Sequence, residues 1–140
     1  MTVIRKTARF DAAHMLSGYE GPCANLHGHG YRIEVAVKGG GEGEGADGGM
    51  VFDFRKLKRI LADKVLARFD HSLIVNTASP LEGEIADLLR PRGMKIAEID
   101  TPSTCENLAR IIFDILVPEI TGLQSVSVWE TPDNHAEYSP

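Results

Sequence analysis

Cysteine and long apolar runs are both scarce in this sequence of 140 residues. Its two cysteines, Cys23 and Cys105, can form at most one disulfide, and a chain of this length buries a sufficient core without one. No apolar run approaches the roughly 18 residues of a membrane span, and residues 1–6 hold no apolar signal-peptide core. We therefore expect one domain over residues 1–140, located in the cytoplasm, with free thiols and no membrane contact.

Positive charge is also in short supply. Lys and Arg number 15 against 20 Asp and Glu, which gives a formal net charge of −5 and a pI near 5.5. Phosphate backbones are held by clustered Lys and Arg, so this balance argues against nucleic acid as a partner. A small anionic substrate needs only a few local cations and stays compatible with the composition.

Apolar and polar residues alternate in several segments, as they do in strands with one buried face. Four polar side chains fall on the apolar parity: His14 at the end of the first segment, His27 and His29 at the start of the second, and Glu130 at the end of the third. The expected strands are Val3–His14, a strand starting at His27, Leu123–Glu130 and a shorter one over His135–Tyr138.

Helical spacing predicts two long helices. The first runs from about Phe54 to Phe69, with its apolar residues on one side, and the second from near Ser103 to about Pro118. Between them, residues 77–101 are hard to assign, with a short helix over Glu82–Leu89 and a short extended piece over Met94–Ile99. The Gly- and Glu-rich residues 39–49 form a flexible connection.

This order of strand, strand, helix, helix, strand, strand predicts an α+β fold. Loop-connected strands favour a four-stranded antiparallel sheet, and two amphipathic helices would cover its apolar face. Such a sheet has two open edges, which natural proteins cover or pair. We therefore expect an oligomer in which the edges of neighbouring sheets join.

The segment Cys23–Tyr31 concentrates the chemistry of the chain. In an extended segment His27 and His29 project from one face, about 6 to 7 Å apart. With His14 from a paired strand they supply three nitrogen ligands, the number found in catalytic zinc sites that keep a fourth position open. Cys23 is then either the fourth ligand of a closed structural site or a base or nucleophile beside the metal, and the spacing does not decide between these two roles.

Six motifs follow one another along nearly the whole chain. They are Phe10-x-x-x-His14, Cys23-x-x-x-His27-Gly28-His29-x-Tyr31, Gly49-Met50-Val51-x-Asp53-Phe54-x-x-Leu57-Lys58, Asp70-His71, Ser103-Thr104-x-Glu106-Asn107 and Trp129-Glu130-Thr131. This ordered set resembles the 6-pyruvoyl-tetrahydropterin synthase family, and within it the bacterial 6-carboxy-tetrahydropterin synthase branch. The resemblance implies a T-fold of the predicted ββααββ order, assembled as a homohexamer whose sheets join into a barrel.

The resemblance also implies roles for eight residues. Zn²⁺ would be bound by His14, His27 and His29; protons would be transferred by Cys23, Asp70 and His71; and the pterin ring would be held by Glu106 and Glu130, with Glu130 counted among the catalytic residues as well. Some of these residues have simpler interpretations. His71 suits the C-terminus of a helix, and Ser103 to Glu106 fits an S-x-x-E capping box. Glu130 on an apolar face needs a hydrogen-bond donor, which a ligand would supply.

The reaction implied is the conversion of 7,8-dihydroneopterin triphosphate to 6-carboxy-5,6,7,8-tetrahydropterin. Triphosphate and acetaldehyde are released, in the biosynthesis of 7-deazaguanine compounds such as queuosine. The short gap between Cys23 and His27 resembles the carboxy branch. The alternatives are 6-pyruvoyl-tetrahydropterin formation at the same site and a zinc- or pterin-binding module without turnover. Residues Thr77–Thr101 exceed the length expected for this branch and would shape the pocket mouth or an oligomer contact.

Overall fold

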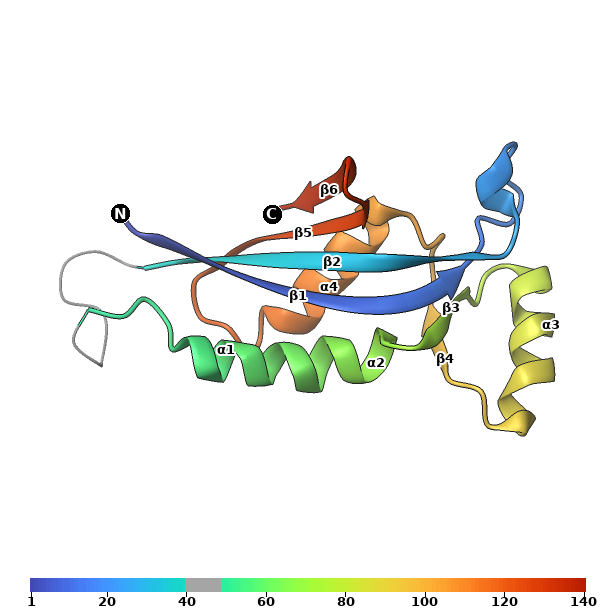
Figure 1. Cartoon of the computed structure of the whole chain (residues 1–140), viewed down its shortest axis with the longest axis horizontal. Helices are drawn as coiled ribbons and strands as arrows, with labels where there is room; N and C mark the ends of the chain where they lie inside the picture. The colour runs from blue at the N-terminus through green and yellow to red at the C-terminus, as the bar shows by residue number, and fades with distance from the viewer. Residues whose placement is uncertain (40–48) are drawn as a thin grey trace.

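The computed structural model describes residues 1–39 and 49–140, so most of the predicted flexible connection lies outside the described part. A six-stranded sheet has the order β4-β3-β1-β2-β5-β6 (Figure 1). The strands are β1 (Val3–His14), β2 (His27–Lys38), β3 (Ser72–Asn76), β4 (Ile96–Ile99), β5 (Leu123–Thr131) and β6 (Asn134–Tyr138). The helices are α1 (Phe54–Leu61), α2 (Ala67–Phe69), α3 (Pro80–Leu89) and α4 (Cys105–Leu116).

The four predicted strands form an antiparallel unit, β1-β2-β5-β6, as the sequence pattern indicated. A π-helical turn over Ala62–Leu66 joins α1 to α2, so that one continuous helix spans Phe54–Phe69 as predicted. The Asp53 side chain caps its start by accepting a hydrogen bond from the Arg55 amide at 2.7 Å. The α+β class is confirmed.

The predicted count of four strands and two helices is wrong. Strands β3 and β4 extend the sheet beyond β1 through parallel pairing, and α3 adds a third helix between them. All five residues of β3 are buried. A strand buried on both sides has no apolar–polar alternation, so this pattern does not reveal it. The short helix and the extended piece predicted within residues 77–101 are confirmed as α3 and β4.

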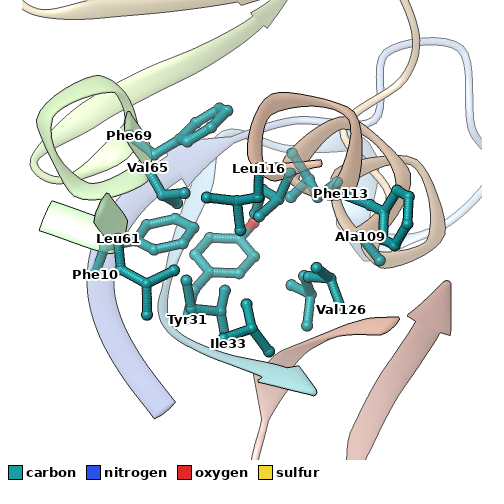
Figure 2. Packing of buried hydrophobic residues seen from close by; sticks show 14 of the residues in the cluster. Phe10, Tyr31, Ile33, Leu61, Val65, Phe69, Ala109, Phe113, Leu116 and Val126 are labelled. Carbon is teal, nitrogen blue, oxygen red and sulfur yellow. The ribbon is translucent and has the colours of Figure 1, made fainter. Parts of the chain in front are cut away.

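The core lies between the sheet and the helices α1–α2 and α4. Phe10 of β1 stacks on Tyr31 of β2, with ring centroids 5.0 Å apart, and also on Phe69 of α2 at 5.8 Å. Figure 2 shows these rings together with side chains of both helices. Within the described part of the chain, no helix is long and apolar enough to cross a membrane. The core fixes the sheet face on which the histidines lie.

Candidate functional site

Three histidines meet at one end of the β1–β2 pair. The antiparallel register sets His14 opposite His27 and Ala12 opposite His29, so the three imidazoles share the helix-covered side of the sheet. Their ring centroids are 4.6 to 5.1 Å apart. One nitrogen of each ring lies within 4.8 Å of the others. This cluster could hold a metal ion.

Backbone carbonyls fix the orientation of two of these rings. The Nδ1 atom of His14 lies 3.0 Å from the carbonyl oxygen of Ser103, and Nδ1 of His27 lies 2.6 Å from that of Asn25. A carbonyl oxygen only accepts, so each Nδ1 carries a proton and donates it. A neutral ring that is protonated on Nδ1 has its lone pair on Nε2. This is the tautomer that binds a metal ion through Nε2.

The two Nε2 atoms of His14 and His27 are 3.1 Å apart. Two lone pairs at this separation repel one another unless a proton or a cation lies between them. Nitrogens bound tetrahedrally to zinc at ~2.0–2.1 Å would be about 3.3 Å apart. The donor atoms, their tautomers and their spacing therefore fit a metal ion of this size.

Burial favours the neutral form of two of these rings, His14 and His29. Burial, together with the charges of His27 and His29, lowers the pKa of His14 to about 4. Burial, followed by the charge of His27, also lowers the pKa of His29. A neutral imidazole is the form that binds a metal ion, so the site is ready to bind at neutral pH.

The metal-free protein is expected to lose stability as the pH falls from about 6.5 toward about 4. In this range the unfolded chain protonates His14 while the folded protein does not, so protons favour the unfolded state. We expect a contribution on the order of 2 kcal/mol. Urea unfolding of chelator-treated protein at pH 7, 6 and 5 measures it, and His14→Gln should flatten the profile. An equally steep profile in the variant would refute the assignment.

Two glutamates lie beside the histidine cluster. Glu130 is half-buried at the end of β5, and burial followed by the negative charge of Glu106 raises its pKa, whereas His27 acts in the opposite direction. Glu106 is exposed in the first turn of α4. The structure therefore brings both predicted pterin contacts to the histidine side of the sheet. Cys105 lies next to Glu130, and burial raises the pKa of its thiol to about 12.

The predicted capping box is wrong. The residue that caps α4 is Thr104, whose hydroxyl accepts a hydrogen bond from the Asn107 amide at 3.3 Å. Ser103 is buried, and both its carbonyl and its hydroxyl oxygen lie 3.0 Å from Nδ1 of His14. Ser103 is thus a site residue that the sequence reasoning missed. Its only sequence signal was its place in the Ser103-Thr104 motif.

Cys23 is exposed in a single 3₁₀ turn, Pro22–Ala24, within the loop that joins β1 to β2. Both cysteines are free thiols, as expected. Among the described residues, the cluster of candidate metal ligands on this side of the sheet comprises the three histidines and excludes Cys23. The geometry therefore does not place Cys23 as a fourth ligand of this cluster.

Asp70 and His71 form the predicted pair directly after α2. His71 Nδ1 lies 3.0 Å from Asp70 Oδ1, and the same oxygen accepts a hydrogen bond from the Asp11 amide at 3.0 Å. This hydrogen bond from Asp11 is the main reason why the pKa of Asp70 is lowered. His71 has a φ of 56°, a left-handed conformation that costs energy in a residue other than glycine. A carboxylate oxygen of Asp11 lies within 4.8 Å of the ligand atoms of this pair. The sequence analysis missed Asp11 because it occupies an ordinary exposed position of the first predicted strand.

The Asp70–His71 pair does not meet the histidine cluster within one chain. Asp11 and Gly28 have the opposite strand parity from His14 and His27. They line an open hollow together with His71 and with His29 of the histidine cluster. The three histidines and the group Asp11, Asp70 and His71 are two separate clusters of candidate ligands. The expected proton exchange between the pair and Cys23 stays a prediction.

Several known proteins are similar to this chain in both sequence and fold. The family model described as 6-pyruvoyl tetrahydropterin synthase matches residues 3–140. A Haemophilus influenzae protein named 6-carboxy-5,6,7,8-tetrahydropterin synthase is 38% identical over 139 residues, 99% of each chain. An Aquifex aeolicus protein of the same name is 33% identical, with 96% of each chain covered. The structure of 6-pyruvoyl tetrahydropterin synthase from Caenorhabditis elegans superposes with a TM-score of 0.72 at 26% identity, covering 99% of this chain and 95% of that one.

Proposed function

The chain belongs to the 6-pyruvoyl tetrahydropterin synthase family, and we propose that it is a zinc-dependent 6-carboxy-5,6,7,8-tetrahydropterin synthase. It converts 7,8-dihydroneopterin triphosphate and water to 6-carboxy-5,6,7,8-tetrahydropterin, with release of triphosphate and acetaldehyde. The observation that carries this proposal is the three-histidine cluster, with two Nε2 atoms 3.1 Å apart and both Nδ1 protons donated to carbonyls. The identity to the Haemophilus protein supports the choice of product.

Each group on the histidine side has a task in this reaction. When bound by the three histidines, Zn²⁺ supplies Lewis acidity to the hydroxyl groups of the substrate side chain. Glu130 accepts hydrogen bonds from a ring N–H and the adjacent amino group of the pterin in a two-point contact, assisted by Glu106. Cys23 removes a proton from a side-chain carbon and returns one later.

We further propose a homo-oligomer, a hexamer by family resemblance, that completes the site. The Asp70–His71 pair belongs to a cluster of side chains separate from the three histidines of its own chain. Joining subunits would bring the pair of one chain to Cys23 of another, where His71 exchanges protons and Asp70 stabilises its charged form. Strands β4 and β6 are the two edges of the sheet and are the places where subunits would join.

The proposed product belongs to the biosynthesis of 7-deazaguanine compounds such as queuosine. We place the reaction in the cytoplasm, where a reducing environment would keep the exposed Cys23 thiol free. The runner-up is 6-pyruvoyl-tetrahydropterin synthase activity, which would use the same residues and keep the three side-chain carbons. The similarity to the Caenorhabditis elegans structure favours this second candidate.

Product analysis distinguishes these activities. Zinc-loaded protein incubated with 7,8-dihydroneopterin triphosphate is expected to yield 6-carboxy-5,6,7,8-tetrahydropterin by mass spectrometry, together with acetaldehyde trapped as a hydrazone. Chelator-treated protein is the control and should leave the substrate intact. A product that retains the three-carbon side chain would establish the runner-up. Unchanged substrate with zinc-loaded protein would identify a pterin- or zinc-binding module without turnover.

A further inference from the structure

Glu82 is a buried carboxylate on α3, the short helix within residues 77–101. Only 2% of its surface is exposed. One carboxylate oxygen accepts a hydrogen bond from the Ser17 hydroxyl at 2.6 Å, and the other accepts one from the backbone N–H of Asn76 at 2.7 Å. A buried carboxylate is tolerated only where such donors replace water. The position is therefore built around the loop residue Ser17.

The start of α3 contributes to the same contact. The Ser79 hydroxyl caps this helix by accepting from the Glu82 amide at 3.4 Å, and it lies 2.7 Å from the Ser17 hydroxyl. Ser17 donates to the carboxylate, so Ser79 is the donor in the contact between the two hydroxyls. Together these three residues form a closed hydrogen-bonded network between α3 and the β1–β2 loop. Figure 1 shows this loop at the same end of the molecule as α3.

The β1–β2 loop also carries Cys23. The Leu16 amide, next to Ser17, donates to the Cys23 carbonyl at 2.9 Å, so Ser17 and Cys23 belong to one closed turn of backbone. Gly18 and Gly21 have φ values of 84° and 154°, conformations that glycine adopts more readily than other residues. Within residues 1–39 and 49–140, Ser17 is the only side chain of residues 16–26 that hydrogen-bonds outside the loop.

We propose that Glu82 is a positioning residue which, through Ser17, holds the loop that presents the Cys23 thiol. Residues 77–101, which were expected to shape a pocket mouth or an oligomer contact, would thereby stabilise the position of the β1–β2 loop. The inference rests on the proposed function in so far as Cys23 transfers protons to and from the substrate. The anchoring of the loop itself rests only on the contacts above.

Three variants of the zinc-loaded protein test this proposal. Ser17→Ala and Glu82→Gln each weaken the contact, whereas Glu84→Gln changes an exposed carboxylate of the same helix and is the matched control. We expect kcat to fall about 10- to 100-fold in the first two variants, because small displacements of a reacting group cost this much. KM should stay within about twofold, because substrate binding is unchanged. Zinc content and the Glu84→Gln variant should match the native protein.

Hydrogen exchange reports on the loop without requiring turnover. In Ser17→Ala and Glu82→Gln, amides of residues 15–24 should exchange about tenfold faster or more, because local opening becomes easier. If native protein lacks turnover, the proposed function fails while this exchange still decides the anchoring. Unchanged exchange in both variants would overturn the proposal. So would faster exchange and a lower melting temperature with kcat within twofold of Glu84→Gln, since Glu82 would then only stabilise the fold.

Discussion

Replacing Cys23 with alanine is expected to lower kcat by about three orders of magnitude while zinc stays at full occupancy. The side chain is exposed in the turn Pro22–Ala24 and lies outside the three-histidine cluster. A general acid–base group contributes about 10²- to 10⁴-fold to a rate, so we expect kcat to fall by about 10³-fold. Steady-state kinetics on protein whose zinc content is measured by atomic absorption gives both quantities for one sample.

Two further variants sharpen the Cys23 experiment. Cys23→Ser should also be nearly inactive, because a serine hydroxyl is a much weaker acid than a thiol and is poorly suited to the same proton transfer. Leu26→Ala alters an exposed side chain of the same loop, 58% accessible, and should retain turnover. Loss of zinc from Cys23→Ala would contradict our assignment, because it would make Cys23 the fourth ligand of a closed structural site.

The fold could be predicted where one face of an element is buried. Burial alternates along β1 and β2, and the helix over Phe54–Phe69 has one apolar side, so periodicity identified each of them. Strand β5 was identified because Val and Ser alternate in its sequence, although residues 125–128 are all buried. Strand β3 is buried throughout, and its parallel pairing with β1 joins residues about 60 positions apart. Neither property produces a local sequence pattern. The predicted sheet therefore had four strands, whereas the structure has six.

Some features of the candidate site could likewise be predicted from the sequence, and others could not. The meeting of the three histidines follows from strand parity and one pairing, both of which can be read from the sequence. The carbonyls of Ser103 and Asn25 could not be predicted, since every residue offers a carbonyl and only the fold selects two of them. Asp70 and His71 were recognised as neighbours in sequence, whereas the side of the sheet on which they lie depends on the β1–β3 contact.

Replacing His27 with alanine is expected to remove zinc binding and, at the same time, to leave the metal-free protein about as stable as the native metal-free protein. In the native chain the lone pairs of His14 and His27 face each other at 3.1 Å, and a bound cation turns this repulsion into attraction. At free zinc 100 times the dissociation constant, binding stabilises a protein by about 2.7 kcal/mol. The variant should lose this increment and all turnover. Relief of the repulsion offsets the lost hydrogen bond to the Asn25 carbonyl, so the two metal-free forms should agree within about 1 kcal/mol.

Thermal unfolding with and without zinc separates these two effects. His135→Ala is the matched control, because His135 is exposed on β6 and stacks on Trp129, away from the three-histidine cluster. It should keep the full stabilisation by zinc and full turnover. Undiminished zinc binding in His27→Ala would show that the metal is held elsewhere. The contrary result is a metal-free His27→Ala protein that is several kcal/mol less stable than the native metal-free protein. It would show that the His27 ring stabilises the fold through its hydrogen bond to Asn25. The short distance between the Nε2 atoms of His14 and His27 would then reflect a shared proton and not a metal site.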